Sequence, residues 1–118
     1  MTNRKIILSK EGEKSYKINF KEPGSKETDF TKVCYINELH SHFVLFSRVT
    51  KINRPLSLYY NGNSHLDEMK DIFDSKSEAE EGLYQYSLNQ AKEIAFWLSS
   101  EIIDETRVKE SPLVSKTA

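Results

Sequence analysis

The side chains in this sequence that could do chemistry are one cysteine and a few histidines and carboxylates. Cys34, His40 and His42 lie near one another in the sequence, and His65 and Asp67 follow later. These are metal-ligand types, but no second set of ligands with zinc-site spacing accompanies them. A nucleophilic Cys34–His pair would also need an orienting group, and the sequence supplies none. We therefore expect no metal, no cofactor and no enzymatic activity.

Other patterns typical of enzymes are also absent. The chain has only 4 glycines and contains no phosphate-binding glycine loop. Its carboxylates cluster around residues 67–81, in the first turns of two predicted helices, where negative charge stabilises the helix dipole. The single cysteine lies in the apolar run Val33-Cys34-Tyr35-Ile36, so we predict a buried structural thiol.

Lysines and aromatic residues interleave in the first half of the chain, as they do in many proteins that bind single-stranded nucleic acid. On this alternative, the contacts would come from Lys17, Lys21, Arg48, Lys51 and Arg54. However, the aliphatic core is small, so most of the aromatic side chains are needed inside the sheet. The sequence therefore favours a protein partner over nucleic acid.

Charge is divided unevenly along the chain, although the net formal charge is only −1. Residues 1–60 carry 11 Lys or Arg and 6 Asp or Glu, whereas residues 61–118 carry 6 and 12. Such asymmetry can steer a partner or a second copy, and an acidic half can mimic nucleic acid.

Length and composition indicate one globular domain. The 118 residues are 37% apolar, enough for a core without disulfides. No apolar run approaches the ~18 residues that a membrane helix needs. We predict one domain over residues 1–106, a flexible polar tail over 107–118, and a cytoplasmic location without membrane contact. A lysine-rich composition, with 13 Lys against 4 Arg, suggests a phage or bacterial accessory protein.

The first sixty residues have the period-2 alternation of β-strands. We predict strands over 5–8, 14–20, 30–36, 43–52 and 56–60, joined by short turns. Short connections favour an antiparallel meander of five strands. A small, partly closed barrel is the alternative, since closure removes exposed edges.

The period changes to 3.6 after residue 60, which predicts two helices. A short one over 65–74 would be capped by Ser64. A long one over 77–103 would begin at a Ser77–Glu80 capping box. The expected fold is therefore an α+β domain with this long helix packed on one sheet face.

The long predicted helix has more apolar surface than one small sheet requires. One stripe is expected to face the sheet: Tyr84, Leu88, Ala91, Ala95, Leu98 and Ile102. An adjoining face would then be left for a partner: Leu83, Tyr86, Ile94, Phe96 and Trp97. Because exposed apolar patches mark interaction surfaces, we predict a small non-enzymatic protein-binding module (an inhibitor, adaptor or regulator) or a homodimer centred on Trp97.

Overall fold

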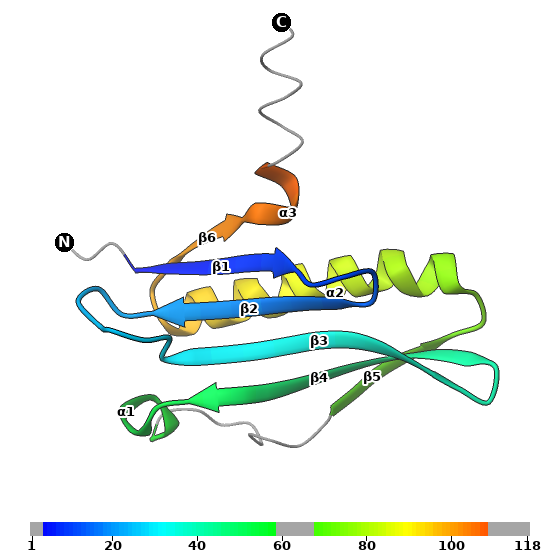
Figure 1. Cartoon of the computed structure of the whole chain (residues 1–118), viewed down its shortest axis with the longest axis horizontal. Helices are drawn as coiled ribbons and strands as arrows, with labels where there is room; N and C mark the ends of the chain where they lie inside the picture. Colours follow the sequence, from blue (N-terminus) through cyan, green and yellow to red (C-terminus); the bar gives the residue numbers. More distant parts are fainter. Residues whose placement is uncertain (1–3, 59–67, 109–118) are drawn as a thin grey trace, which may run out of the picture.

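The structure is a computed structural model that describes residues 4–58 and 68–108. The chain is α+β, as its sequence predicts (Figure 1). Its elements are, in order, β1 (Lys5–Lys10), β2 (Ser15–Lys21), β3 (Phe30–Leu39), β4 (His42–Ile52), α1 (Arg54–Ser57), β5 (Glu68–Phe73), α2 (Lys76–Trp97), β6 (Glu101–Asp104) and α3 (Glu105–Val108). Within these two ranges, no helix combines the length and apolar character needed to span a membrane.

The strands form one open sheet in the order β5-β4-β3-β2-β1-β6. The first five strands make an antiparallel meander, and β6 adds parallel to β1, with Lys5 opposite Glu101. The predicted antiparallel meander is thus confirmed in outline, with one more strand than expected. In the described part of the chain the two edge strands do not pair with each other, so the sheet is not closed into the alternative barrel.

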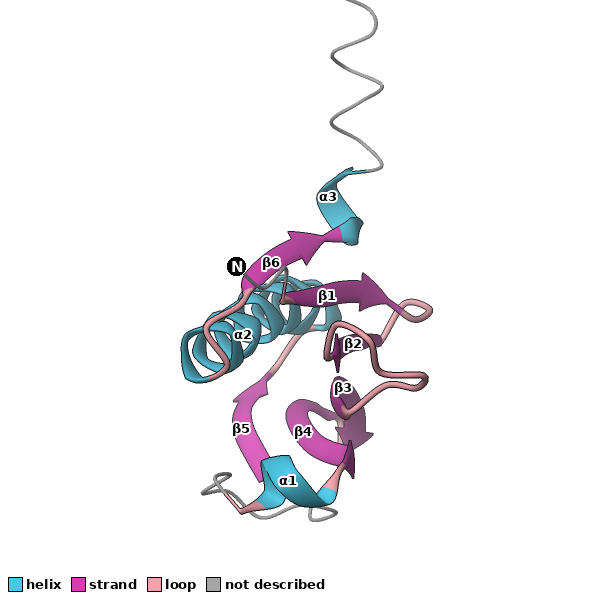
Figure 2. Cartoon of the chain, turned by 90° about the vertical axis from the view of Figure 1, so that its left-hand side faces the viewer, coloured by secondary structure: helices cyan, strands magenta, loops and turns pink. Residues whose placement is uncertain are grey.

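Helix α2 lies on one side of the sheet, which curves around it (Figure 2). The residues that allow close packing are small: Ala79, Ser87 and Ala91 are all fully buried. Gly82 is required for the same reason, because a Cβ there would lie 2.7 Å from the ring of Phe73. The core sits between α2 and this sheet face, and its strand residues include Ile6, Leu8, Ile18, Phe20, Phe30 and Val49.

The face of α2 that meets the sheet contains Ala91, Ala95 and Leu98 of the predicted stripe, but its other residues differ from the prediction. Leu83 and Ile94, expected to lie on a partner face, belong to the core, with 0% and 6% of their surfaces exposed. Tyr84 and Leu88 are only partly buried beside it. In the first half of the helix the buried line runs through Ala79, Leu83 and Ser87, which are spaced by four and lie one residue before the predicted positions 84 and 88.

Residues 54–57 form helix α1 instead of the start of the predicted strand over 56–60. Asn53 caps this helix by accepting a hydrogen bond from the Leu56 amide at 2.9 Å. Pro55 lies in the first turn, where its missing N–H costs no helical hydrogen bond. Residues 59 and 60 lie outside the described residues.

A helix was predicted over residues 65–74, but residues 68–73 form strand β5, so the prediction was wrong for these residues. The antiparallel register with β4 shifts between Leu45 and Phe46, which leaves Lys70 as the extra residue of a bulge. The bulge brings Met69 and Ile72 to the same face, opposite Phe46 and Val44. Apolar residues three positions apart normally indicate one face of a helix. Here the bulge in the strand produces the same spacing, so the sequence was misinterpreted as helical. Ser64, the expected cap, lies outside the described residues.

Helix α2 ends at Trp97, earlier than the predicted residue 103. Ser99 adopts the left-handed conformation with φ 51°, and the Ser100 amide donates to the Ala95 carbonyl at 2.8 Å. This is the hydrogen bonding of a helix end at which glycine is the usual residue. The chain then extends as β6, and Arg107, predicted to open the tail, lies in α3. Residues 109–118 lie outside the described residues.

Helix α2 begins two residues earlier than the predicted capping box. The cap is Ser75, whose Oγ accepts from the Glu78 amide at 3.2 Å and donates to a Glu78 carboxylate oxygen at 3.1 Å. Ser77, the predicted cap, is instead exposed within the first turn. Ser-x-x-Glu occurs in both registers, and the structure uses the first.

We expect Ser75→Ala to lower the free energy of unfolding by about 0.5–2 kcal/mol, because it removes the only side-chain acceptor of the Glu78 amide in the described structure. The matched variant Ser77→Ala should change it by less than about 0.5 kcal/mol, as exposed substitutions usually do. Urea unfolding of both variants provides the comparison. A larger loss for Ser77→Ala than for Ser75→Ala would contradict the assigned cap.

Candidate interaction surface

Cys34 lies beneath α2 and is fully buried, as the sequence predicts. Burial raises the pKa of its thiol to about 11, an effect that the nearby Ser87 hydroxyl and Lys32 ammonium only partly oppose. A catalytic pairing with histidine is not formed. His40 is six residues further along β3 and its turn, about 20 Å in an extended chain, and His42 contacts Asp74 at 3.1 Å.

The histidines instead belong to the β3–β4 turn. His40 and Ser41 both have positive φ, 51° and 70°, as the two central residues of a tight two-residue hairpin turn require. Among the described residues, no group of three or more His, Cys, Asp or Glu side chains could hold a metal ion. The other two candidate ligands, His65 and Asp67, lie outside the described residues.

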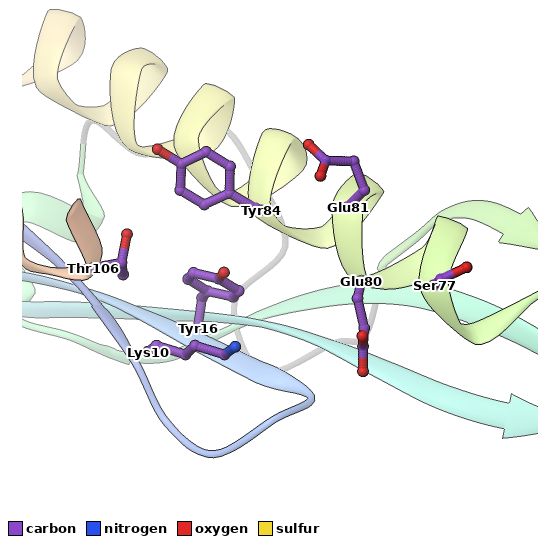
Figure 3. A pocket seen from close by; sticks show the side chains of 7 residues that line it. All are labelled: Lys10, Tyr16, Ser77, Glu80, Glu81, Tyr84 and Thr106. Carbon is purple, nitrogen blue, oxygen red and sulfur yellow. The ribbon is translucent and has the colours of Figure 1, made fainter. Parts of the chain in front are cut away.

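A shallow cavity of about 390 Å³ lies between the β1–β2 end of the sheet, α2 and α3 (Figure 3). The rings of Tyr16 and Tyr84 meet there at 5.9 Å, and Lys10 Nζ lies 5.8 Å from the centre of the Tyr16 ring. The Tyr84 hydroxyl donates to Asp104 Oδ2 at 2.8 Å. The remaining lining is polar: Ser77, Glu80, Glu81 and Thr106. Since small-molecule sites are mostly apolar and enclosed, we assign this cavity no ligand.

The predicted partner face on the helix is smaller than expected. Besides the buried Leu83 and Ile94, Tyr86 is half-buried and its hydroxyl donates to Ser47 Oγ at 2.6 Å. Trp97 is partly buried and packs edge-on against Phe30 at 6.0 Å. Only Phe96, which is 90% exposed, points fully into solvent. The five predicted residues therefore do not form one exposed patch.

The opposite side of the sheet, here called the open face, faces away from α2 (Figure 2), and no described element packs over it. The strand register arranges its central side chains in three cross-strand rows, because directly paired residues point to the same side. The rows are Asn19–Thr31–Lys51, Lys17–Val33–Arg48 and Ser15–Tyr35–Phe46–Met69. These rows contain three cations and no carboxylate.

Tyr35 and Phe46 stack on one another in the third row. Their ring centres are 5.6 Å apart and their planes differ by 21°, and both side chains are partly exposed. Sequence reasoning did not single out this pair. The alternation in each strand could have found it, since Tyr35 lies between the buried Cys34 and Ile36, and Phe46 between the buried Leu45 and Ser47.

Two of the five basic candidates are paired with acids from neighbouring loops. Lys17 Nζ lies 2.8 Å from Glu11, and Lys51 Nζ lies 2.9 Å from Glu27. The hydrogen bond and positive charge of Lys51 hold the pKa of Glu27 below its usual value. Arg48 and Lys21 are exposed on strands of the sheet, and Arg54 is exposed in α1, outside the three rows. Arg48 also has an interaction partner.

The loop that carries Glu27 is anchored by Asp29. The Asp29 carboxylate accepts hydrogen bonds from the Glu22 amide at 2.8 Å and from Asn53 Nδ2 at 2.7 Å. Burial raises the pKa of Asp29, but these hydrogen bonds and one from Ser25 lower it more, so it stays below the usual value. These hydrogen bonds hold the loop that carries Glu27 against the end of the sheet.

Comparison with known proteins gives no relative: no protein-family model, no curated protein and no solved structure matches this chain.

We expect the Cys34 thiol to react slowly in the native protein. With a pKa of about 11, the rate of labelling by a disulfide reagent should keep rising by about tenfold per pH unit above pH 9, because only the thiolate reacts. The same chain in denaturant should react much faster and level off near pH 9. Fast native labelling that levels off there would contradict a buried thiol.

Proposed function

We propose that the chain is a small non-enzymatic binding module whose open face holds single-stranded nucleic acid. The observation that supports this most directly is the stacked Tyr35–Phe46 pair, on a face whose central rows carry cations and no carboxylate. The proposal departs from the preference for a protein partner that the sequence gives.

The aromatic pair suits unpaired bases. Every base has a flat apolar face, so stacking on an exposed ring is largely independent of sequence and contributes about 1–3 kcal/mol per base. Tyr35 and Phe46 lie on the central strands β3 and β4, where flanking strands hold the backbone in place. A base can stack on this pair without rearrangement of the sheet.

The cations suit the phosphates that accompany those bases. Arg48 lies on the same face as Phe46, two residues along β4 and so about 7 Å away. Lys17 is in the row of Arg48, and Lys51 is in the next row. A strand crossing the sheet from the aromatic row toward Lys51 would pass Arg48 and then meet Lys17 and Lys51, which exchange their Glu11 and Glu27 partners for phosphates in this proposal.

Charge repulsion from the acidic second half would oppose nucleic-acid binding. In α2 the acidic residues are Glu78, Glu80, Glu81 and Glu93, and α2 packs on the other side of the sheet (Figure 2). A helix axis lies roughly 10 Å from the sheet it packs on, more than the Debye length of about 8 Å at physiological salt. The carboxylates of α2 are therefore separated from the open face by the sheet, whereas Glu68 and Asp71 lie exposed in the edge strand β5.

A protein partner bound at α2 is the second candidate, and one observation favours it. Phe96 is 90% exposed beside the partly buried Trp97, and aromatic side chains are common anchors of protein interfaces. Phe96→Ala should leave stability nearly unchanged, so it separates this candidate from the open face in each experiment below.

The first test measures fluorescence anisotropy of labelled oligo(dT) and oligo(U) at low salt. We expect Phe46→Ala to weaken binding by about 5-fold to 150-fold, the equivalent of one lost stacking contact. Phe96→Ala, the same change on the helix, should bind like the unmodified chain. Thermal unfolding confirms that both variants are folded. Absence of saturable binding, or equal losses in both variants, would overturn the proposal.

The second test follows salt dependence. Arg48→Ala should reduce the slope of log affinity against log salt by about 0.7, the value for one phosphate contact to a single strand. Lys92→Ala, an exposed cation on α2, should leave the slope unchanged. Glu27→Gln should tighten binding, because it removes the carboxylate paired with Lys51. Weaker binding by Glu27→Gln would contradict a role for Lys51.

A further inference from the structure

The edge strand β5 is the most exposed strand of the sheet. Among the described elements it pairs only with β4, and each of its residues except Phe73 is exposed. Met69 and Ile72 are 62% and 51% exposed. The Ile72 amide donates to the carboxylate of its own neighbour Asp71, at 2.9 Å on the surface. An edge with exposed apolar side chains is a template for another strand.

We propose that the occupant of this edge is a second copy of the chain, paired antiparallel β5 to β5 about a two-fold axis between Lys70 and Asp71. The central four residues of β5, Met-Lys-Asp-Ile, are self-complementary in this register. Each Lys70 lies opposite Asp71 of the second copy, and each Met69 opposite Ile72. A two-fold interface requires such reciprocal matching, since the same surface serves both sides.

The bulge in β5 is compatible with this register. It places Met69 and Ile72 on the same side of the strand, next to Phe46 and Val44 of β4. In the dimer the two Met–Ile contacts therefore lie together on the open face, where they extend the apolar row that contains Tyr35 and Phe46. The two charge pairs lie between them, at the symmetry axis.

The expected dimer is weak. A pair of six-residue strands buries much less than the roughly 1,600 Å² of a standard protein interface. The population of dimer should therefore rise with protein concentration. The inference does not rest on the proposed nucleic-acid binding. A single copy of the chain already carries all three cross-strand rows of the open face, so a monomer would be able to bind.

Sedimentation velocity over a concentration series tests the dimer and its register. We expect the unmodified chain to shift from monomer to dimer, whereas Lys70→Glu and Asp71→Lys each stay monomeric, because each places like charges opposite one another. An equimolar mixture of these two variants should dimerise again, since every reversed side chain then meets an opposite charge. The double variant Lys70→Asp/Asp71→Lys should also dimerise.

Several outcomes would overturn the inference. A chain that stays monomeric at every concentration would show that the charges and bulge protect the edge, which is their other known use. A dimer that survives both reversals, or is lost in Phe96→Ala, would place the interface elsewhere. Circular dichroism establishes that each variant is folded. Oligonucleotide binding by Lys70→Glu separates this inference from the proposed function, since a monomer should still bind.

Discussion

One helix has to cover the whole sheet, and the rest of the structure depends on that constraint. Helix α2 contacts all six strands, which is possible because the sheet curves around it (Figure 2). Close approach needs small side chains along the contact line, and Ala79, Ser87 and Ala91 provide them. Gly82 admits the Phe73 ring at the edge of the sheet. Among the elements of residues 4–58 and 68–108, α2 covers one face of the sheet and none packs over the other.

The layer between α2 and the sheet also contains polar groups that fix how the helix sits. Tyr86 donates to the fully buried Ser47, and Lys32 Nζ donates to Gln90 Oε1. Burial raises the pKa of Tyr86 above its usual value, so the hydroxyl, protonated at neutral pH in any case, also stays protonated in more alkaline solution. A helix rotated by one residue would separate these partners and leave them buried without hydrogen bonds, which costs about 1–3 kcal/mol for each group. These polar contacts thus favour one rotation of α2 about its axis, whereas apolar side chains alone would be compatible with two rotations.

Prediction from sequence succeeded where one physical signal dominated. Period-2 alternation identified β2 and the hairpin of β3 and β4, and the apolar surroundings of Cys34 indicated its burial. It failed where two signals competed. In β5 a bulge gave Met69 and Ile72 the spacing of a helix, and after Trp97 a serine took the place of the glycine that usually marks a helix end. The residues Asn-Arg-Pro at the start of α1 are a typical helix-capping sequence. The neighbouring residues 56–60 favour a strand, and the prediction followed them instead.

The candidate surface was less predictable than the fold. Whether an aromatic side chain points inward or outward depends on the strand register, and composition says nothing about register. Tyr16, Phe20 and Phe30 are in the core as expected, whereas Tyr35 and Phe46 alternate to the other side. The partner face expected on α2 is smaller for a similar reason, since two of its residues, Leu83 and Ile94, are in the core.

The parallel pairing of β6 with β1 has a consequence for how the chain is made. Strand β1 receives its second neighbour only when residues 101–104 have been synthesised. Until then β1 is an unprotected edge, although it is an interior strand of the finished sheet. Pairing between such distant parts of a chain also slows folding, because a large loop must close first. Until β6 pairs with it, β1 is therefore a second exposed edge of the sheet, beside the edge at β5.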